Sequence, residues 1–342
     1  MSSGYPDRTD VPQRPRWLLP FGIFSVLFLI ASQAAALLLS APDRDMGNLQ
    51  KNLYVHVPSA GMSMIAPAVV FVASVLYLWK RQPKHDMIAA AAAQVGIVFI
   101  GLTLIQGSIW ARPTWGIWWT WDPRLTTTAI LFLIYAGYLA LRAFTEDEDQ
   151  RARWSAAVGI LGFLNVPIVY MSVRWWRTIH QVQSTPATVD PLYKLGLRLN
   201  AFAFLFLMIF FIALRYHAAR LERAAHLLEI RAGTVSEIAY AVGFKSVSHF
   251  SNAFLSRYGC RPSGYPADAK KRKDAADHHE KGDAIGEGQG GADLVGVALV
   301  QDVAAARVLH EDTPVRAVER RPIDDGRDAF GEVGVGAAAG CG

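Results

Sequence analysis

The chain has 342 residues, of which 52% are hydrophobic and 18% are charged, and its formal net charge is +5. This composition is too apolar and too poor in charge for an ordinary soluble domain. The apolar residues also occur in long blocks instead of being dispersed along the chain, which indicates a protein that crosses a membrane.

Six apolar blocks are long enough to cross a bilayer, which requires about 20 apolar residues in a helix. They cover residues 17–40, 58–79, 87–109, 126–143, 154–173 and 196–214. Asn165 and Pro167 interrupt the fifth block, which a bundle tolerates when neighbouring helices satisfy the freed backbone groups. The first block is longer than the apolar stretch of a typical signal peptide, which favours a retained span over the alternative of a cleaved signal peptide. We therefore predict an all-α fold, a polytopic bundle of six transmembrane helices within residues 1–216.

The segment HVPSAG opens the second of these spans. Proline is favoured at the first position of a helix, so Pro58 predicts a helix start that leaves His56 just outside the helix N-terminus. The positive end of the helix dipole would favour the neutral form of that imidazole.

The segment TWGIWWTWDPRL lies between the third and fourth spans. Asp122 followed by Pro123 is a typical helix start, with Asp as the N-cap. Seven of the ten tryptophans lie in two loops on one side of the bundle, namely Trp110, Trp115, Trp118, Trp119, Trp121, Trp175 and Trp176. An aromatic belt at the membrane interface is one interpretation, but such belts occupy both interfaces. We favour the other interpretation, an aromatic platform for a flat apolar ligand.

A second histidine follows the fifth span in the segment RWWRTIHQ. If the helix extends past the span, Trp176 and His180 would share one face, being four residues apart. A single histidine near a membrane is more often a structural residue than a ligand. His56 and His180 together, in different loops on one face, match a pair of axial imidazoles on haem iron.

Arginines accompany these residues. Haem carries two propionates, and the guanidinium group pairs well with carboxylates. The candidates are Arg112, Arg124, Arg174 and Arg177, of which Arg124 and Arg177 lie nearest to the aromatic residues in the sequence. Contact with lipid headgroups is the alternative role for each of them.

The loop cations predict the orientation of the bundle. Counted close to the ends of the spans, twelve Lys and Arg residues lie on the side of the two termini, and seven lie in the loops on the other side. Cytoplasmic loops carry an excess of such residues, so we predict that both termini are cytoplasmic and that the tryptophan-rich loop is outside.

Residues 217–267 differ in composition from the spans and predict a small cytoplasmic helical appendage. SEIAYAVGF, a turn at Gly243 and SVSHFSNAFLSRYG indicate a helix-turn-helix. Its expected core is Ile238, Ala239, Val242, Phe250 and Phe254. Its candidate base contacts are Ser248, His249 and Asn252, with Lys245 or Arg257 as candidate phosphate contacts.

Residues 220–266 resemble the second helix-turn-helix of AraC-type transcription regulators. That family uses two such units in each DNA-binding domain, and only one is visible in this chain. A single unit offers too few phosphate contacts for firm binding, so we do not expect DNA to be a partner.

Residues 268–342 are rich in Gly, Ala, Asp, Val and Arg and show no periodicity, which predicts a disordered tail. Both cysteines, Cys260 and Cys341, lie beyond the last span, and no CxxC pair or CxxCH motif occurs. The chain also lacks a GxxxxGK[ST] phosphate loop, so an ATP-driven step would need a partner.

The segments HVPSAG, WGIWWTWDPRLTT and RWWRTIHQ, spread over six spans, resemble the haem exporter protein C (CcmC) family of bacterial cytochrome c maturation. The resemblance covers about residues 15–216. It implies a protein of the bacterial inner membrane, not an enzyme, that binds haem b on its periplasmic side and passes it to a periplasmic haem chaperone. It also implies an ABC-type ATPase with its membrane subunits and a small single-span protein as partners.

The resemblance assigns a role to particular residues of this chain. The family's axial ligands correspond to His56 and His180. Its tryptophan-rich motif corresponds to Trp115, Trp118, Trp119, Trp121 and Asp122.

Two alternatives stay open at this point. The first is a membrane-tethered, AraC-like regulator whose outer loops sense a signal and whose residues 220–266 read DNA. The second is a haem-binding subunit of the other cytochrome c assembly route, whose proteins share the tryptophan motif. Those proteins usually have more spans, so the count of six argues against the second alternative.

Overall fold

The structure is a computed structural model that describes residues 15–180 and 191–265 of the chain. The regular elements within these two ranges are helices. The tail predicted at residues 268–342 lies outside the described residues.

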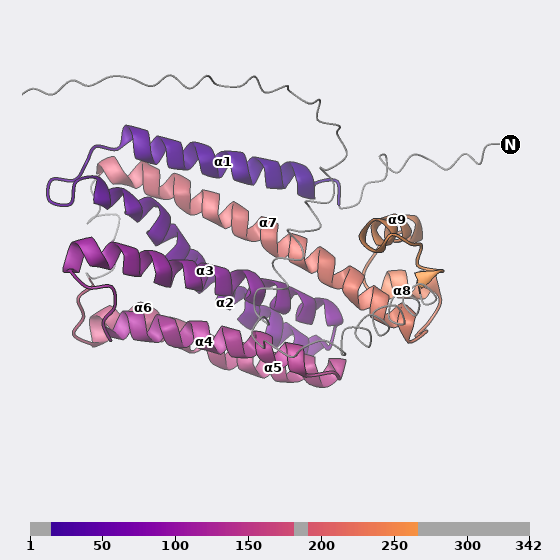
Figure 1. Cartoon of the computed structure of the whole chain (residues 1–342). Helices are drawn as coiled ribbons and strands as arrows, with labels where there is room; N and C mark the ends of the chain where they lie inside the picture. The colour runs from indigo at the N-terminus through magenta and orange to yellow at the C-terminus, as the bar shows by residue number, and fades with distance from the viewer. Residues whose placement is uncertain (1–14, 181–190, 266–342) are drawn as a thin grey trace, which may run out of the picture. The chain divides into compact units, whose positions relative to one another are not determined.

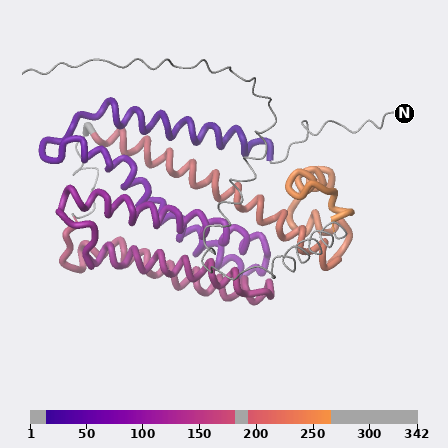
Figure 2. The backbone as a smooth tube through the Cα atoms, in the orientation of Figure 1, coloured from indigo at the N-terminus to yellow at the C-terminus, as the bar shows by residue number. Residues whose placement is uncertain are grey.

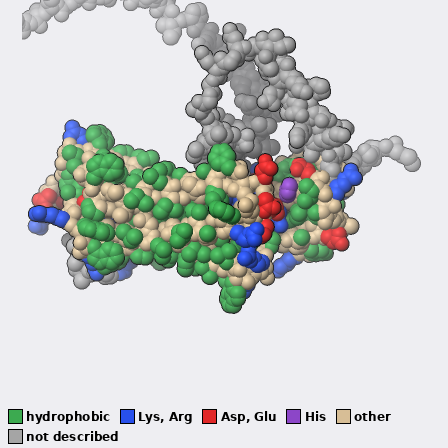
Figure 3. Space-filling view, turned by 90° about the horizontal axis from the view of Figure 1, so that it is seen from below, with side chains coloured by type: hydrophobic (Ala, Val, Ile, Leu, Met, Phe, Trp, Pro, Cys, Tyr) green, Lys and Arg blue, Asp and Glu red, His purple; other side chains and the backbone are tan. Residues whose placement is uncertain are grey.

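Six helical segments are long and apolar enough to cross a membrane, which confirms the predicted six-span, all-α fold. Figure 1 shows them packed side by side. They are α1 (Leu18–Leu39), α2 (Leu53–Lys80, after the short 3₁₀ helix η2, Asn48–Asn52), α3 (Pro83–Trp115), α4 (Pro123–Phe144), the pair α5 (Glu148–Phe163) and α6 (Asn165–Trp175), and α7 (Pro191–Glu229). In Figure 3, hydrophobic side chains run along the visible face of the bundle, as a lipid-facing surface requires.

The centre of the bundle is the contact between α2 and α3. Ala66 of α2 and Ala92 and Ala93 of α3 are fully buried. A Cβ atom placed on Gly96 would lie only 3.0 Å from the Cβ of Ala66. Small residues allow such close approach of helix backbones in a membrane, so this pair forms the rigid element against which α5 and α7 also pack.

The start of α2 differs from the prediction. The helix begins at Leu53, so Pro58 lies inside it and His56 is its fourth residue instead of a residue outside its N-terminus. Proline cannot donate to the carbonyl four residues earlier, which is that of Tyr54. The side-chain amide of Gln33 in α1 donates to this oxygen at 3.3 Å. A contact from another helix thus allows α2 to continue through the proline.

The fifth span is broken where the sequence indicates. Leu164 separates α5 from α6, and Pro167 follows within the first turn of α6. The side chain of Asn165 donates to the carbonyl of Thr127 in α4 at 2.8 Å. Asn165 therefore connects two spans. After the break, α6 ends at the end of the bundle where the fourth span begins.

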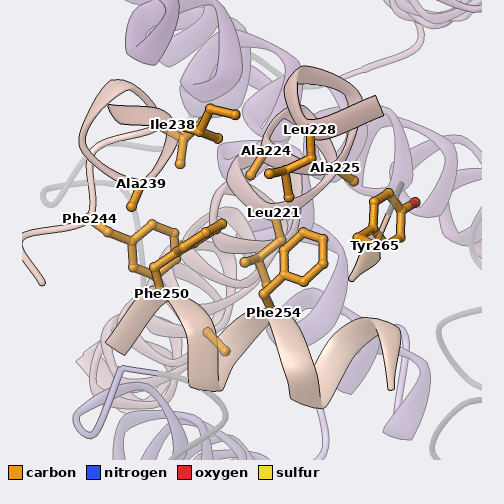
Figure 4. Close-up of a cluster of buried hydrophobic side chains, with 12 residues drawn as sticks. Leu221, Ala224, Ala225, Leu228, Ile238, Ala239, Phe244, Phe250, Phe254 and Tyr265 are labelled. Carbon is orange, nitrogen blue, oxygen red and sulfur yellow. The ribbon is translucent and has the colours of Figure 1, made fainter. Parts of the chain in front are cut away.

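The last span continues without interruption into the helix-turn-helix. α7 runs through the predicted boundary at residue 216, and its last turns bury Leu221, Ala224 and Leu228 against the two helices that follow, α8 (Val235–Ala241) and α9 (Val247–Tyr258). Figure 4 shows Phe250 and Phe254 facing the side chains from α7. All five residues predicted to form the core are buried, namely Ile238, Ala239, Val242, Phe250 and Phe254.

Local signals fix the boundaries of the two short helices. Thr234 and Glu237 form a capping box, in which the Thr234 hydroxyl accepts from the Glu237 amide and the Glu237 carboxylate accepts from the Thr234 amide. Gly243 has a φ of +85°, which a glycine adopts without strain. The turn therefore lies where the sequence predicts it.

Two polar contacts tie the extension of α7 to the bundle. Arg215 donates from Nε to Gln94 of α3 at 2.7 Å. Arg223 forms an ion pair with Glu148 of α5 at 2.8 Å. The helix-turn-helix is therefore attached to the bundle by a continuous helix and by side-chain contacts on two other spans.

Candidate functional site

The predicted ligand-binding residues of the bundle lie at one end of it. Successive spans run in opposite directions, so α2 and α4 begin where α3 and α6 end (Figure 2). We call this the site end. The helix-turn-helix follows the other end of α7, at the opposite end of the bundle (Figure 1).

The tryptophans of the loop at residues 115–121 are exposed. The exposed fractions of Trp115, Trp118, Trp119 and Trp121 are 41%, 59%, 37% and 79%. Trp175 and Trp176, which end α6, are also exposed. Exposed apolar surface of this extent on neighbouring segments indicates a surface that another molecule covers, either a ligand or lipid.

Asp122 joins the two loops of the site end. It is the N-cap of α4, as predicted, and its Oδ1 accepts from the Arg124 amide at 2.9 Å. The same carboxylate also accepts from the loop after α6: from the Thr178 hydroxyl, from the Ile179 amide at 2.9 Å and from Nδ1 of His180 at 3.0 Å. Asp122 is only 5% exposed, so one buried carboxylate connects residues that lie 58 positions apart in the sequence.

His180 is held by this carboxylate and not by a helix. The condition for a shared helical face is not met, because α6 ends at Trp175 and Trp176 adopts an extended conformation with φ −126° and ψ 159°. Trp176 and His180 therefore do not share a helical face. The aromatic neighbour of His180 is Trp115, whose ring meets it edge-on with the centroids 5.2 Å apart.

The electrostatics of the pair favour a neutral imidazole beside an ionised carboxylate. Burial lowers the pKa of His180, and the opposing effect of the Asp122 charge is smaller. Burial alone would raise the pKa of Asp122, but hydrogen bonds from Thr178, Ile179 and Arg124 outweigh it and hold that pKa below its ordinary value. An ionised carboxylate only accepts hydrogen bonds, so Nδ1 of His180 carries the proton and Nε2 keeps its lone pair.

His56 lies in the second turn of α2 and packs against α3. Its ring meets Trp110 edge-on with the centroids 5.7 Å apart. Gly107 lies behind the ring, since a Cβ on that residue would be 3.2 Å from Cε1 of His56. His180 and Arg124 lie close enough to His56 for a charge on either side chain to act on it, so the two histidines are neighbours at the site end.

The arginines separate into two groups. Arg124, in the first turn of α4, is partly buried beside Asp122, whereas Arg177, Arg112 and Arg174 are exposed. Arg112 donates to the carbonyl of Gly116, where α3 ends. Of the two predicted anion partners, Arg124 lies in the site and Arg177 lies on its rim.

This arrangement suits a metal that brings most of its own ligands. Within the described residues, no group of three or more His, Cys, Asp or Glu side chains could hold a metal ion, although protein sites for zinc usually need three or four. Two imidazoles are enough for an iron whose four equatorial positions belong to a porphyrin. Exposed indole rings next to them offer flat surfaces on which such a ring can stack.

The sequence alone did not reveal two supporting residues. Thr178 donates to Asp122 and accepts from the amide of His180 at 3.0 Å, a local turn that a threonine two residues before a histidine could have suggested. Gly107 provides the space for His56. A glycine inside a membrane helix signals close packing, but it does not show which side chain fills the space.

The helix-turn-helix exposes a polar face. Ser248 and His249 on α9 are exposed and Asn252 is partly buried, so the predicted base contacts are accessible. The two predicted phosphate contacts, Lys245 and Arg257, are both exposed, and Arg257 also forms an ion pair with Glu222 of α7 at 3.4 Å.

Comparison with known families gives two matches along the chain. Residues 9–231 match the family described as heme exporter protein C. Residues 214–267 match a helix-turn-helix domain family. The two matches overlap on the last turns of α7, the helix that the two regions share.

Curated relatives match the membrane region. The heme exporter protein C of Bradyrhizobium diazoefficiens is 37% identical over 196 residues, which are 56% of this chain and 74% of the relative. That of Escherichia coli K12 is 33% identical over 231 residues, or 67% and 92% of the two chains. That of Haemophilus influenzae is 35% identical over 214 residues, or 61% and 87%.

Proposed function

Because this chain belongs to the heme exporter protein C family, we propose that it binds haem at the site end and delivers it for cytochrome c maturation. The single observation that carries this proposal is the hydrogen bond between buried Asp122 and partly buried His180 beside exposed tryptophans, with His56 on a neighbouring helix. It assembles neutral imidazoles and flat apolar surfaces, which are the groups that haem needs.

Each group has a distinct task. His56 and His180 supply the two axial nitrogens, and haem b needs no covalent attachment for such binding. Trp115, Trp118, Trp119 and Trp121 cover the porphyrin and exclude water. Arg124 and Arg177 pair with the propionates. None of these tasks makes or breaks a covalent bond of the ligand, so the proposed role is transport and not catalysis.

The proposed orientation places the site end in the periplasm and both termini in the cytoplasm of a bacterial inner membrane. The excess of Lys and Arg on the side opposite to the site end supports it. A periplasmic haem chaperone would then meet the exposed tryptophans. The ABC-type ATPase, its membrane subunits and the small single-span protein are proposed as the partners that drive and regulate release.

The visible spectrum of the purified full-length protein tests haem binding. We expect a low-spin Soret band from two imidazole ligands, and loss of that band in a His56→Ala, His180→Ala double variant. The matched control is a His226→Ala, His249→Ala double variant, because both of these histidines are exposed and lie away from the site end. An unchanged band in the first double variant contradicts the axial assignment.

Cysteine labelling tests the orientation. In a variant with Cys260 and Cys341 replaced by serine, a cysteine at exposed Leu49, in the segment between α1 and α2, should react with a membrane-impermeant maleimide in intact cells. A cysteine at exposed Gln82, between α2 and α3, should react only after the membrane is opened. The reverse pattern contradicts the proposed orientation.

A membrane-tethered regulator is the second candidate function, and the helix-turn-helix match with its accessible α9 face favours it. Ser248, His249 and Asn252 would contact bases. Lys245 and Arg257 would contact phosphates, and Arg257 would have to leave its ion pair with Glu222 to do so. Few phosphate contacts mean weak binding. We therefore expect that the full-length protein in detergent does not retain DNA in a sequence-specific way. Retention that is sequence-specific and sensitive to salt would establish the second function.

A further inference from the structure

The two histidines of the site differ in the contacts of their Nδ1 atoms. Nδ1 of His180 donates to Asp122 at 3.0 Å. Nδ1 of His56 is buried and has no hydrogen-bond partner in the described part of the chain. Packing against Trp110 and Gly107 holds the His56 ring.

A carboxylate behind a ligating histidine changes the bond to the metal. It accepts the Nδ1 proton, fixes the tautomer and the ring orientation, and increases the basicity of Nε2. Hydrogen bonding of this kind also stabilises the more oxidised state of the iron and so lowers its reduction potential. His180 has this support and His56 does not, so two chemically identical ligands should bind with different strength.

The support of His180 does not depend on a bound ligand. Asp122 is buried, caps α4 and accepts from Arg124, Thr178 and Ile179 as well as from His180. These contacts fix the carboxylate before haem arrives. No comparable polar contact fixes His56 among the described residues, so its ring can leave a metal without breaking a hydrogen bond to the protein.

We propose that His180 is the retaining ligand of haem, that His56 is the exchangeable ligand, and that Asp122 is the positioning residue that makes them unequal. This inference rests on the proposed haem-binding function. Delivery then begins with cleavage of the bond between His56 and the iron, and the electron pair returns to the imidazole. A lone pair from a nitrogen or sulfur side chain of the acceptor protein fills the open position, so the iron changes a ligand and no electron is transferred.

Spectroscopy of the full-length protein loaded with haem tests this asymmetry. We expect His180→Ala to lower the haem affinity by about 10-fold more than His56→Ala, within the range known for loss of such support. Asp122→Asn should raise the haem dissociation rate by about 10–100-fold and shift the reduction midpoint to a more positive potential. Asparagine caps helices as well as aspartate does, so α4 should stay intact.

Two further variants separate the positioning role from a structural one. Asp147→Asn is the matched control, because Asp147 caps α5 by the same kind of contact, to the Gln150 amide, at the opposite end of the bundle. It should leave the potential and the dissociation rate unchanged. Thr178→Val keeps the Asp122 carboxylate but removes one of its hydrogen-bond donors. Its reduction midpoint should therefore shift to a more positive potential, but by less than that of Asp122→Asn.

The outcomes distinguish this inference from the proposed function. If the wild type and the His56→Ala, His180→Ala double variant bind haem with the same spectrum, the axial assignment itself fails. If the double variant loses haem but His56→Ala weakens binding as much as His180→Ala, the inequality is wrong. An Asp122→Asn variant with wild-type potential and dissociation rate would also overturn the role of Asp122.

Discussion

The helix-turn-helix and the site end are both rich in aromatic residues, but they place them differently. In the helix-turn-helix, Phe250 and Phe254 are fully buried and pack on each other with ring centroids 5.5 Å apart. At the site end, Trp118 and Trp121 are 59% and 79% exposed. The same class of residue therefore completes a core in one region and stays on the surface in the other.

This difference separates stability from binding. Burial of a phenylalanine stabilises the folded state through the apolar area that it removes from water. An exposed tryptophan contributes little to folding, and its apolar area becomes useful when another molecule covers it. Substitutions should consequently affect the unfolding of one region and the ligand affinity of the other.

The largest expected effect is that of Phe254→Ala. Loss of a fully buried phenylalanine typically costs about 3–5 kcal/mol, which is enough to open α8 and α9 locally. Hydrogen exchange of the full-length protein should show faster exchange in residues 220–265 and an unchanged haem spectrum. Phe144→Ala, at a residue that is 79% exposed, is the control and should change neither. Loss of haem binding in Phe254→Ala would show that the two regions are not separable.

A smaller effect, on haem affinity and not on folding stability, is expected for Trp118→Ala. The thermal midpoint should stay unchanged, and the haem affinity should fall by about 0.5–1.5 kcal/mol, the size of a specific aromatic contact. That loss corresponds to a severalfold higher Kd, which a haem titration measures. The matched control is Trp79→Ala, because Trp79 is 77% exposed but lies at the other end of α2. Equal losses in both variants would favour the interfacial belt over the ligand platform.

Hydropathy predicted the six spans because a bilayer imposes one requirement on every crossing helix, a long apolar run. The core of the helix-turn-helix was predictable for a similar reason, since Ile238 and Val242, and again Phe250 and Phe254, lie four residues apart, the spacing of a buried helical face. Both signals are local, and every residue needed to recognise them lies within one segment.

The parts of the site that differ from the prediction depend on contacts between distant segments. Pro58 predicted a helix start, but Gln33 of another span satisfies the carbonyl that the proline leaves free, and His56 lies inside the helix as a result. A helix that extended past the fifth span would have placed His180 on the face of Trp176, but the helix ends at Trp175. Asp122, 58 positions earlier in the sequence, holds His180 instead. The residue types suggested the candidates for one ligand, and the structure brings Asp122, Trp115 and His180 into contact. The sequence could not show which contacts hold these side chains, and the difference between His56 and His180 lies in those contacts.

The smallest expected effect concerns the connection between the two regions. Arg223 and Glu148 form an ion pair in which the side chains are 25% and 26% exposed, and such pairs near a surface contribute about 0.2–1 kcal/mol. Arg223→Gln should therefore accelerate hydrogen exchange in the extension of α7 slightly and leave the haem affinity unchanged. Arg153→Gln is the control, since Arg153 pairs with Asp149 within α5 at 3.1 Å and is more exposed. A change in haem affinity in Arg223→Gln alone would mean that the helix-turn-helix and the site end are coupled through the bundle, because the substituted residue lies at the end opposite to the histidines. Buried and exposed aromatics would then belong to one cooperative system, and α7, which joins the regions without a break, would be the element that carries the coupling.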